Sequence, residues 1–247
     1  MFTAETFKRR RGMLAEMLPP EFCLAVPAAS SIPSSSDAVH DLVPSRNLFY
    51  LAGITQEESW LFMWRLAGDS QTRECLYISP YDEEYAKWYG TVLTREQAAA
   101  VSGVEDVRFT GGQEKFLSRL VCREGIRTVF FDWHRTALGD HPGRGLALVN
   151  RFRRHFPEVE AAGVSDRINR LRMIKDDSEV AMIREAVALT RRGFERALSR
   201  LEPGMKEYAF EAELLYAWAL EGEKKPAFPA ICAGGSRATC LHYSENS

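Results

Sequence analysis

The sequence predicts an α/β protein, in which a mixed sheet flanked by helices is followed by the opening part of an α+β unit. Short apolar runs alternate with segments of helical period between residues 22 and 156, an order typical of a sheet with helices on its faces. A long helical pattern from Val180 to Leu201 then separates this region from further elements. A chain of 247 residues suits two domains, which we place at 1–166 and 167–247.

The amino-terminal part is predicted to contain one helix and several strands. Apolar residues on one face of 3–18 indicate a helix, and Pro19-Pro20 end it because proline cannot continue a helix. The basic run at residues 8–11 is expected to be a solvated face of that helix. The predicted strands are 22–26, 49–53, 59–65 and 73–79, with a loop at 27–44 and a hairpin turn at Gly68-Asp69.

From residue 82 onward the apolar residues recur mostly at helical spacing. The predicted helices are 82–89, 94–101, 112–123 and 143–156, and the predicted strands are 105–109 and 128–132.

The strongest local pattern marks the start of the second unit. Asp176-Asp-Ser-Glu179 has the form of a capping box, in which an acid three residues after the N-cap satisfies a free backbone N–H. The helix that it opens should stop at Pro203-Gly204. The predicted elements after it are a helix at 206–221, a strand at 226–233, a turn at Gly234-Gly235 and the start of a strand at 240–243.

Composition and charge argue against several classes of protein. Hydrophobic residues make up 45% of the chain and charged residues 27%, values typical of a folded globular protein. The net charge of −2 argues against a nucleic-acid partner. The longest apolar run, Trp60–Trp64, is too short to cross a membrane, and basic residues occupy the place of a signal sequence. Five dispersed cysteines without a Cys-x-x-Cys pair predict reduced thiols and a cytoplasmic protein.

Taken alone, the polar residues offer few candidates for chemistry. No histidine pair has the spacing of a helical zinc site, and no phosphate loop or serine nucleophile elbow is present. Asp132 with His134 is a candidate ligand pair at a strand end, although an ordinary turn is the favoured interpretation. A metal cluster of Asp37, His40 and Asp41 is a further, less favoured candidate. His242 follows a Gly-Gly turn, a place where residues that contact ligands often lie.

Four segments in order nevertheless resemble the aminopeptidase P (Xaa-Pro aminopeptidase) family. Ser45–Gly53 is similar to its R-x-N-x-x-Y-L-T-G segment, and Arg170–Arg184 to the R-x-x-K-x-x-x-E-I-x-x-x-R junction shared with creatinase and prolidase. Pro203–Tyr208 is similar to P-G-M-x-E-Y, and Leu241–Asn246 to L-H-Y-x-x-N. Each motif is weak alone, but four in the same order make the resemblance strong.

This resemblance implies a creatinase-type amino-terminal domain followed by the start of a pita-bread metallopeptidase domain. It implies a peptidase that cleaves Xaa-Pro bonds in proline-containing peptides by means of two divalent metals, usually manganese, and that forms homo-oligomers. His242 matches the family histidine that binds substrate and stabilises the tetrahedral intermediate, so it is the expected catalytic residue. Trp88 matches an aromatic residue that a neighbouring subunit contributes to substrate binding. No residue of this chain is a predicted metal ligand.

The family's five metal ligands, two Asp, one His and two Glu, follow the L-H-Y-x-x-N motif. We therefore expect residues 1–247 to hold no metal pair and to have no peptidase activity by themselves. A non-catalytic peptide- or protein-binding relative and a prolidase-like dipeptidase remain as alternatives. We also expect exposed apolar surface on the second unit, with self-association or mobility after about residue 200.

Overall fold

The computed structural model describes residues 2–30, 35–36, 40, 42–133 and 144–247. The described chain forms two compact units, one of residues 2–174 and the other of residues 175–247. The sequence-based boundary, between residues 166 and 167, lies within a helix that belongs to the first unit.

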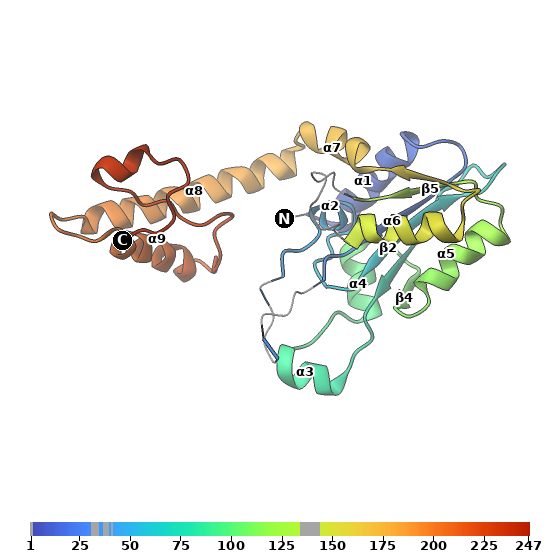
Figure 1. Ribbon diagram of the computed structural model, residues 1–247, viewed down its shortest axis with the longest axis horizontal. Coiled ribbons are helices and arrows are strands. Elements are labelled where there is room, and N and C mark those ends of the chain that lie inside the picture. Colours follow the sequence, from blue (N-terminus) through green and yellow to red (C-terminus); the bar gives the residue numbers. More distant parts are fainter. Residues whose placement is uncertain (1, 31–34, 37–39, 41, 134–143) are drawn as a thin grey trace. The chain divides into compact units, whose positions relative to one another are not determined.

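The first unit is built on a mixed sheet with helices packed beside it (Figure 1). The sheet has six strands in the order β4-β3-β2-β1-β5-β6. The pairs β1–β2 and β2–β3 are antiparallel, whereas β1–β5, β5–β6 and β3–β4 are parallel. This arrangement confirms the predicted mixed sheet. The strands are β1 Phe22–Pro27, β2 Trp60–Arg65, β3 Arg73–Ile78, β4 Val107–Phe109, β5 Thr128–Phe131 and β6 Glu160–Gly163.

Helices cover both faces of this sheet, as predicted. Successive side chains of a strand point to opposite faces, so Leu24 and Val26 join one core cluster while Cys23 and Ala25 join the other. The first cluster includes residues of α1, α2, α4 and α7, and the second includes residues of α5 and α6. The helices are α1 Ala4–Glu16, α2 Arg46–Ala52, α3 Glu83–Tyr89, α4 Arg95–Ser102, α5 Gln113–Cys122, α6 Arg144–His155 and α7 Ser165–Met173.

The predicted strand at 49–53 is wrong, because this segment lies in helix α2 and its end. The Ser45 side chain accepts a hydrogen bond from the Leu48 backbone N–H at 3.2 Å and so caps the start of the helix. Gly53 ends it in the left-handed conformation, with φ of 69°. A short apolar run fits a strand and a buried helix equally well, and here the two caps determine the helix. Strand β6 and helix α7 were not predicted.

The basic run of α1 is only partly a solvated face. Lys8 and Arg9 are exposed, but Arg10 and Arg11 are 2% and 1% exposed. The Arg10 guanidinium lies 4.2 Å from the centre of the Tyr50 ring. Arg11 donates to the backbone oxygens of Leu51 and Ser102, both at 2.9 Å, and pairs with a carboxylate of β3. The expected solvated face is therefore wrong for two of its four residues, because these two have buried acceptors or aromatic partners.

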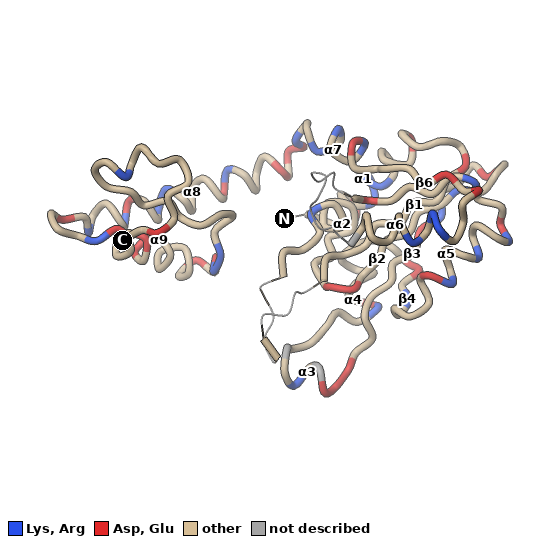
Figure 2. Tube along the Cα trace, in the orientation of Figure 1, with Lys and Arg blue, Asp and Glu red and all other residues tan. Residues whose placement is uncertain are grey.

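The second unit begins with the helix pair α8 (Asp177–Arg200) and α9 (Glu207–Leu220). The predicted capping box is confirmed, since Asp176 accepts from the Glu179 N–H and Glu179 accepts from the Asp176 N–H. The two helices pack closely at Gly193, where an added Cβ would lie 2.2 Å from Nε1 of Trp218. Acidic and basic residues both occur along α8 (Figure 2).

The strands predicted at 226–233 and from 240 are wrong. The chain after α9 contains the short 3-10 helix η1 (Gly235–Thr239) and otherwise no regular element up to residue 247. A strand requires a neighbouring strand to pair its backbone groups. In this segment several backbone groups bond to side chains instead, as described below.

Apolar side chains remain exposed on the second unit, as expected. Ile183, Val187, Phe194 and Leu198 of α8 are 49%, 62%, 46% and 57% exposed. The self-association expected from this surface stays a prediction. Among the helices of the described residues, none is both long and apolar enough to cross a membrane.

Candidate functional site

The candidate functional site is the segment Cys240–Ser247, here called the His242 loop. His242 and its neighbour Leu241 form a turn just after η1, and both side chains are exposed. The two residues of the loop that are buried are Tyr243 and Asn246, at 9% and 3% exposure. The loop therefore presents His242 to solvent while its next neighbour is anchored in the unit.

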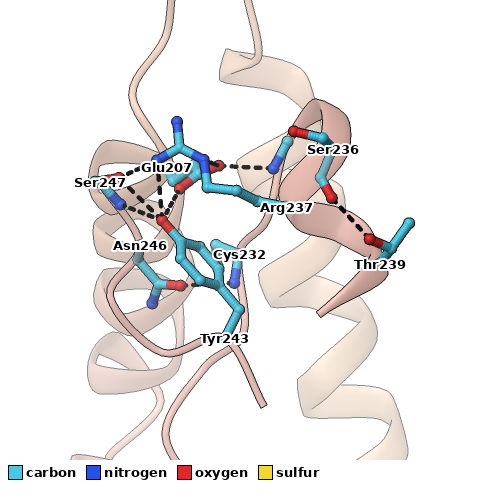
Figure 3. Close-up of polar contacts among 9 residues, drawn as sticks. Glu207, Cys232, Ser236, Arg237, Thr239, Tyr243, Asn246 and Ser247 are labelled. Atoms are coloured by element: carbon cyan, nitrogen blue, oxygen red, sulfur yellow. Dashed lines mark hydrogen bonds and ion pairs between the residues drawn. The ribbon is translucent and has the colours of Figure 1, made fainter. Parts of the chain in front are cut away.

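The first anchor is a carboxylate at the start of α9. Oε2 of Glu207 accepts a hydrogen bond from the Tyr243 hydroxyl at 2.7 Å (Figure 3). Oε1 accepts one from the Gly234 backbone N–H, also at 2.7 Å. The Arg237 guanidinium lies 3.4 Å from the same carboxylate and donates to the Tyr243 hydroxyl at 3.2 Å. A single side chain of α9 thus connects Gly234, the residue before η1, to the residue that follows His242.

The second anchor is the side chain of Asn246. Its amide oxygen accepts from the Cys232 backbone N–H at 2.9 Å, and its amide nitrogen donates to Glu211 at 2.8 Å and to the Ala230 carbonyl at 2.9 Å. The Asn246 backbone has φ of 46°, a left-handed conformation that asparagine tolerates better than most residues. These bonds hold the end of the His242 loop against α9 and the irregular segment before η1.

The electrostatics favour an ionised Glu207. The hydrogen bond from Tyr243, followed by the one from the Gly234 backbone, lowers the pKa of Glu207 below its usual value, and Arg237 acts in the same direction. The positive end of the α9 dipole also favours a negative charge at this position. Burial raises the pKa of the nearby Cys232 thiol, so this cysteine stays protonated.

The anchoring residues were not among the predicted site residues. Glu207 stands in the P-G-M-x-E-Y segment, and Tyr243 and Asn246 stand in the L-H-Y-x-x-N segment. The sequence carried the signal, since both motifs include these positions, but only the fold shows that the two segments contact each other.

The second predicted residue, Trp88, lies on α3 of the first unit. Its side chain is 77% exposed, and the helix ends at Tyr89, just before Gly90 with φ of 88°. Trp88 and His242 belong to different compact units.

The two other candidate sites are the pair Asp132 and His134 and the cluster Asp37, His40 and Asp41, and each includes residues outside the described part of the chain. His134, Asp37 and Asp41 lie outside the described residues, and His40 is exposed. Asp132 is buried and its carboxylate has structural partners: Asn47 donates to its two oxygens at 2.9 and 3.0 Å, and the Ser165 hydroxyl donates at 2.9 Å.

This buried network joins two of the recognised motifs. Arg172 of the junction motif donates to Oδ1 of Asn47 at 2.7 Å, and Asn47 belongs to the 45–53 segment. Arg172 also lies 5.9 Å from the centre of the Tyr50 ring. The 45–53 motif and the first part of the junction motif therefore meet inside the first unit.

Within the described ranges, no group of three or more His, Cys, Asp or Glu residues is arranged to hold a metal ion. The candidate site in the His242 loop therefore consists of hydrogen-bonding side chains and the imidazole of His242.

Comparison with known proteins supports the resemblance seen in the motifs. The profile of the aminopeptidase P N-terminal domain matches residues 7–130, which is half of the chain. The chain belongs to the aminopeptidase P family. The profile of metallopeptidase family M24 matches residues 181–247, in the second unit.

Individual relatives of the family agree over nearly all of the chain. The Xaa-Pro aminopeptidase of Escherichia coli K12 is 24% identical over 245 residues, covering 98% of this chain and 55% of that protein. A solved Bacillus anthracis structure, provisionally named an aminopeptidase P, has a TM-score of 0.95 and 29% identity, and covers 99% of this chain and 58% of that one. The low-pH form of E. coli aminopeptidase P has a TM-score of 0.85 at 23% identity and covers 100% of this chain and 56% of that one.

The fold class is confirmed by these matches: a mixed α/β domain of the aminopeptidase P type is followed by the start of a pita-bread domain. The chain spans about half the length of the relatives that it matches.

Proposed function

We propose that residues 1–247 form the amino-terminal portion of a metal-dependent Xaa-Pro aminopeptidase. Such an enzyme releases the N-terminal residue from peptides that have proline in second position. The observation that carries the proposal is the His242 loop, in which two anchored residues hold an exposed imidazole at the family motif. The relatives named Xaa-Pro aminopeptidases support the same assignment.

In this proposal His242 contacts the substrate and donates a hydrogen bond to the oxygen that becomes negative as the peptide bond is attacked. Preorganised donors at a developing oxyanion accelerate acyl-transfer reactions because they need no rearrangement during the reaction. Trp88, exposed on α3, is proposed to contact the substrate of a neighbouring copy in a homo-oligomer.

The proposed activity requires two divalent metals, expected to be manganese, that activate the attacking water. The described residues of this chain do not fit such a centre, since they provide no cluster of metal-ligating side chains. No reaction step is therefore assigned to a metal on these residues. We propose that the 247-residue chain alone is inactive and that its location is cytoplasmic.

The experiment is a peptide-cleavage assay on the purified 247-residue chain with added manganese, together with a calorimetric titration of the metal. The expected results are no release of the residue before proline and no saturable binding of manganese. Cleavage of an Xaa-Pro peptide by this chain would show that the metal ligands are wrongly assigned.

The coding frame after codon 247 tests the enzyme assignment itself. Two Asp, one His and two Glu at family spacing would support the peptidase, and the His242→Ala variant of that longer protein should then lose most of its activity. A stop codon at this point, or substitution of those ligands, would favour the peptide- or protein-binding alternative. Cleavage of dipeptides only would favour the prolidase-like alternative.

A further inference from the structure

We propose that Glu207 and Tyr243 are positioning residues that fix the backbone of His242 in a single conformation before substrate arrives. This inference rests on the proposed role of His242 and assigns a task to two residues that touch neither substrate nor metal in that proposal. It is carried by the hydrogen bonds on both sides of His242 and by the burial of its neighbours.

The geometry closes a small ring of chain. Glu207 holds Gly234 with one carboxylate oxygen and Tyr243 with the other, each at 2.7 Å (Figure 3). Residues 234–243, including η1, are thereby tied at both ends to the first turn of α9. His242 is the last residue inside this ring, so the two bonds restrict the movement of its backbone relative to α9.

The Tyr243 hydroxyl is the centre of the anchor. It donates to Glu207, accepts from the Ser247 backbone N–H at 3.1 Å and from Arg237 at 3.2 Å, and lies 2.9 Å from the Ser247 hydroxyl. The tyrosine is 9% exposed, so its polar tip has exchanged water for these partners. A buried hydroxyl with several partners, one of them charged, resists displacement more than an exposed one does.

The residues around His242 differ in their burial. Tyr243 and Asn246 are buried, whereas Leu241 and His242 are exposed, with Leu241 at 85%. The Tyr243 hydroxyl makes hydrogen bonds rather than apolar contacts. These bonds hold Tyr243 in place and thereby orient the preceding residue, His242, toward solvent.

Such positioning matters for the proposed chemistry because an oxyanion donor acts only at short range. A displacement of about 1 Å can lower a reaction rate by about 100-fold. A loop without regular structure, such as 240–247, needs side-chain anchors to reach that accuracy.

The test uses NMR on the full 247-residue chain labelled at the histidine Cε1 position and at the backbone amides. His242→Gln assigns the His242 signal among the five histidines. The expected wild-type result is one narrow His242 resonance and slow exchange of the Gly234 and Ser247 amides, which donate to Glu207 and to the Tyr243 hydroxyl. Tyr243→Phe and Glu207→Gln should broaden or split that resonance. Exchange of the Gly234 amide in Glu207→Gln and of the Ser247 amide in Tyr243→Phe should also rise by at least about tenfold, the effect of losing a hydrogen bond of about 1.5 kcal/mol.

Two matched variants of α9 serve as controls. Tyr216→Phe removes a hydroxyl from a half-exposed tyrosine whose ring contacts Arg196, and Glu213→Gln removes a carboxylate that pairs with Arg196 at 2.8 Å. Neither residue has a hydrogen bond or ion pair with the His242 loop among the described contacts. Both controls should leave the His242 resonance unchanged.

The inference is overturned if Tyr243→Phe and Glu207→Gln give the wild-type His242 resonance and loop exchange. If either variant also loses amide protection throughout α9, Arg237→Ala decides the question, because this half-exposed residue can be removed without disturbing the core. A changed His242 resonance with α9 intact then supports the inference, and an unchanged one overturns it.

These measurements require neither metal nor peptide. A failure here would leave the proposed peptidase function standing, because His242 could act from a flexible loop. Conversely, normal peptide cleavage by a longer protein carrying His242→Ala would refute the proposed role of His242 and leave the anchor intact.

Discussion

Replacing Asn47 by alanine should destabilise the first unit more than any exposed asparagine would. Asn47 is 2% exposed. Its side-chain amide donates to the two oxygens of the Asp132 carboxylate at 2.9 and 3.0 Å and accepts from the Arg172 guanidinium at 2.7 Å. Alanine removes all of these bonds and leaves Asp132, at 8% exposure, with Ser165 as its described side-chain donor. Removing a partner from a buried charged group costs about 3 kcal/mol.

The measurement is hydrogen exchange of the β1 and β5 amides in the native state, together with urea unfolding. A loss of about 3 kcal/mol raises the open population about 100-fold. Asn150→Ala is the control, because Asn150 is exposed on α6 and its loss should change the free energy of unfolding by less than about 0.5 kcal/mol.

A double-mutant cycle with Asp132→Ala isolates the interaction. Because the two side chains are in direct contact, the coupling energy should be at least about 1.5 kcal/mol. Equal stabilities of Asn47→Ala and Asn150→Ala, or additive effects in the cycle, would refute the reasoning that this network holds the 45–53 segment in place.

Three further outcomes are expected. Gly193→Ala should destabilise the second unit by about 1–3 kcal/mol in thermal unfolding, because the new Cβ would lie 2.2 Å from Nε1 of Trp218. Order in the His242 loop should be present above the pKa of an unfolded glutamate, about 4.3, and lost as the pH falls through the lowered pKa of folded Glu207. Exchange of the Gly234 and Ser247 amides, corrected for intrinsic rates, measures this change. A thiol reagent should label Cys122 and Cys240 rapidly and the other cysteines only on unfolding.

Each of these outcomes has its own comparison. Gly12→Ala should be neutral or stabilising by up to about 1 kcal/mol, since an added Cβ there meets no atom within 4 Å in the middle of α1. Glu207→Gln should remove the acid transition of the loop, and an unchanged transition would assign it to another group. Rapid labelling of Cys75, whose pKa burial raises to about 12, would contradict the buried position of β3.

The sequence was sufficient for the elements whose signals are local. The capping box at Asp176–Glu179 specified the start of α8 to the residue, because its hydrogen bonds link positions three apart. The strands β1, β2, β3 and β5 were predicted nearly in full, since each is an apolar run bounded by turn residues. The motif order also pointed to the family, which the comparisons confirm.

Only the tertiary structure decided the features that depend on distant partners. Residues 49–53 belong to a helix whose buried side chains share a core cluster with those of α1 and α4, whereas the apolar run by itself fits a strand equally well. Residues 226–247 form no strand, and the backbone groups of Ala230, Cys232 and Gly234 bond instead to the distant side chains of Asn246 and Glu207.

The same distinction applies to charge and to the candidate site. Arg11 is buried because the fold brings backbone oxygens of α2 and α4 to it, which no neighbouring residue in the sequence reveals. The motif in the sequence predicts His242 as a site residue. Nothing in the sequence indicates that Glu207, 35 positions earlier than His242, anchors the adjacent Tyr243. Local hydrogen bonds and periodicity can be read along the chain, whereas contacts between distant segments exist only after folding has brought them together.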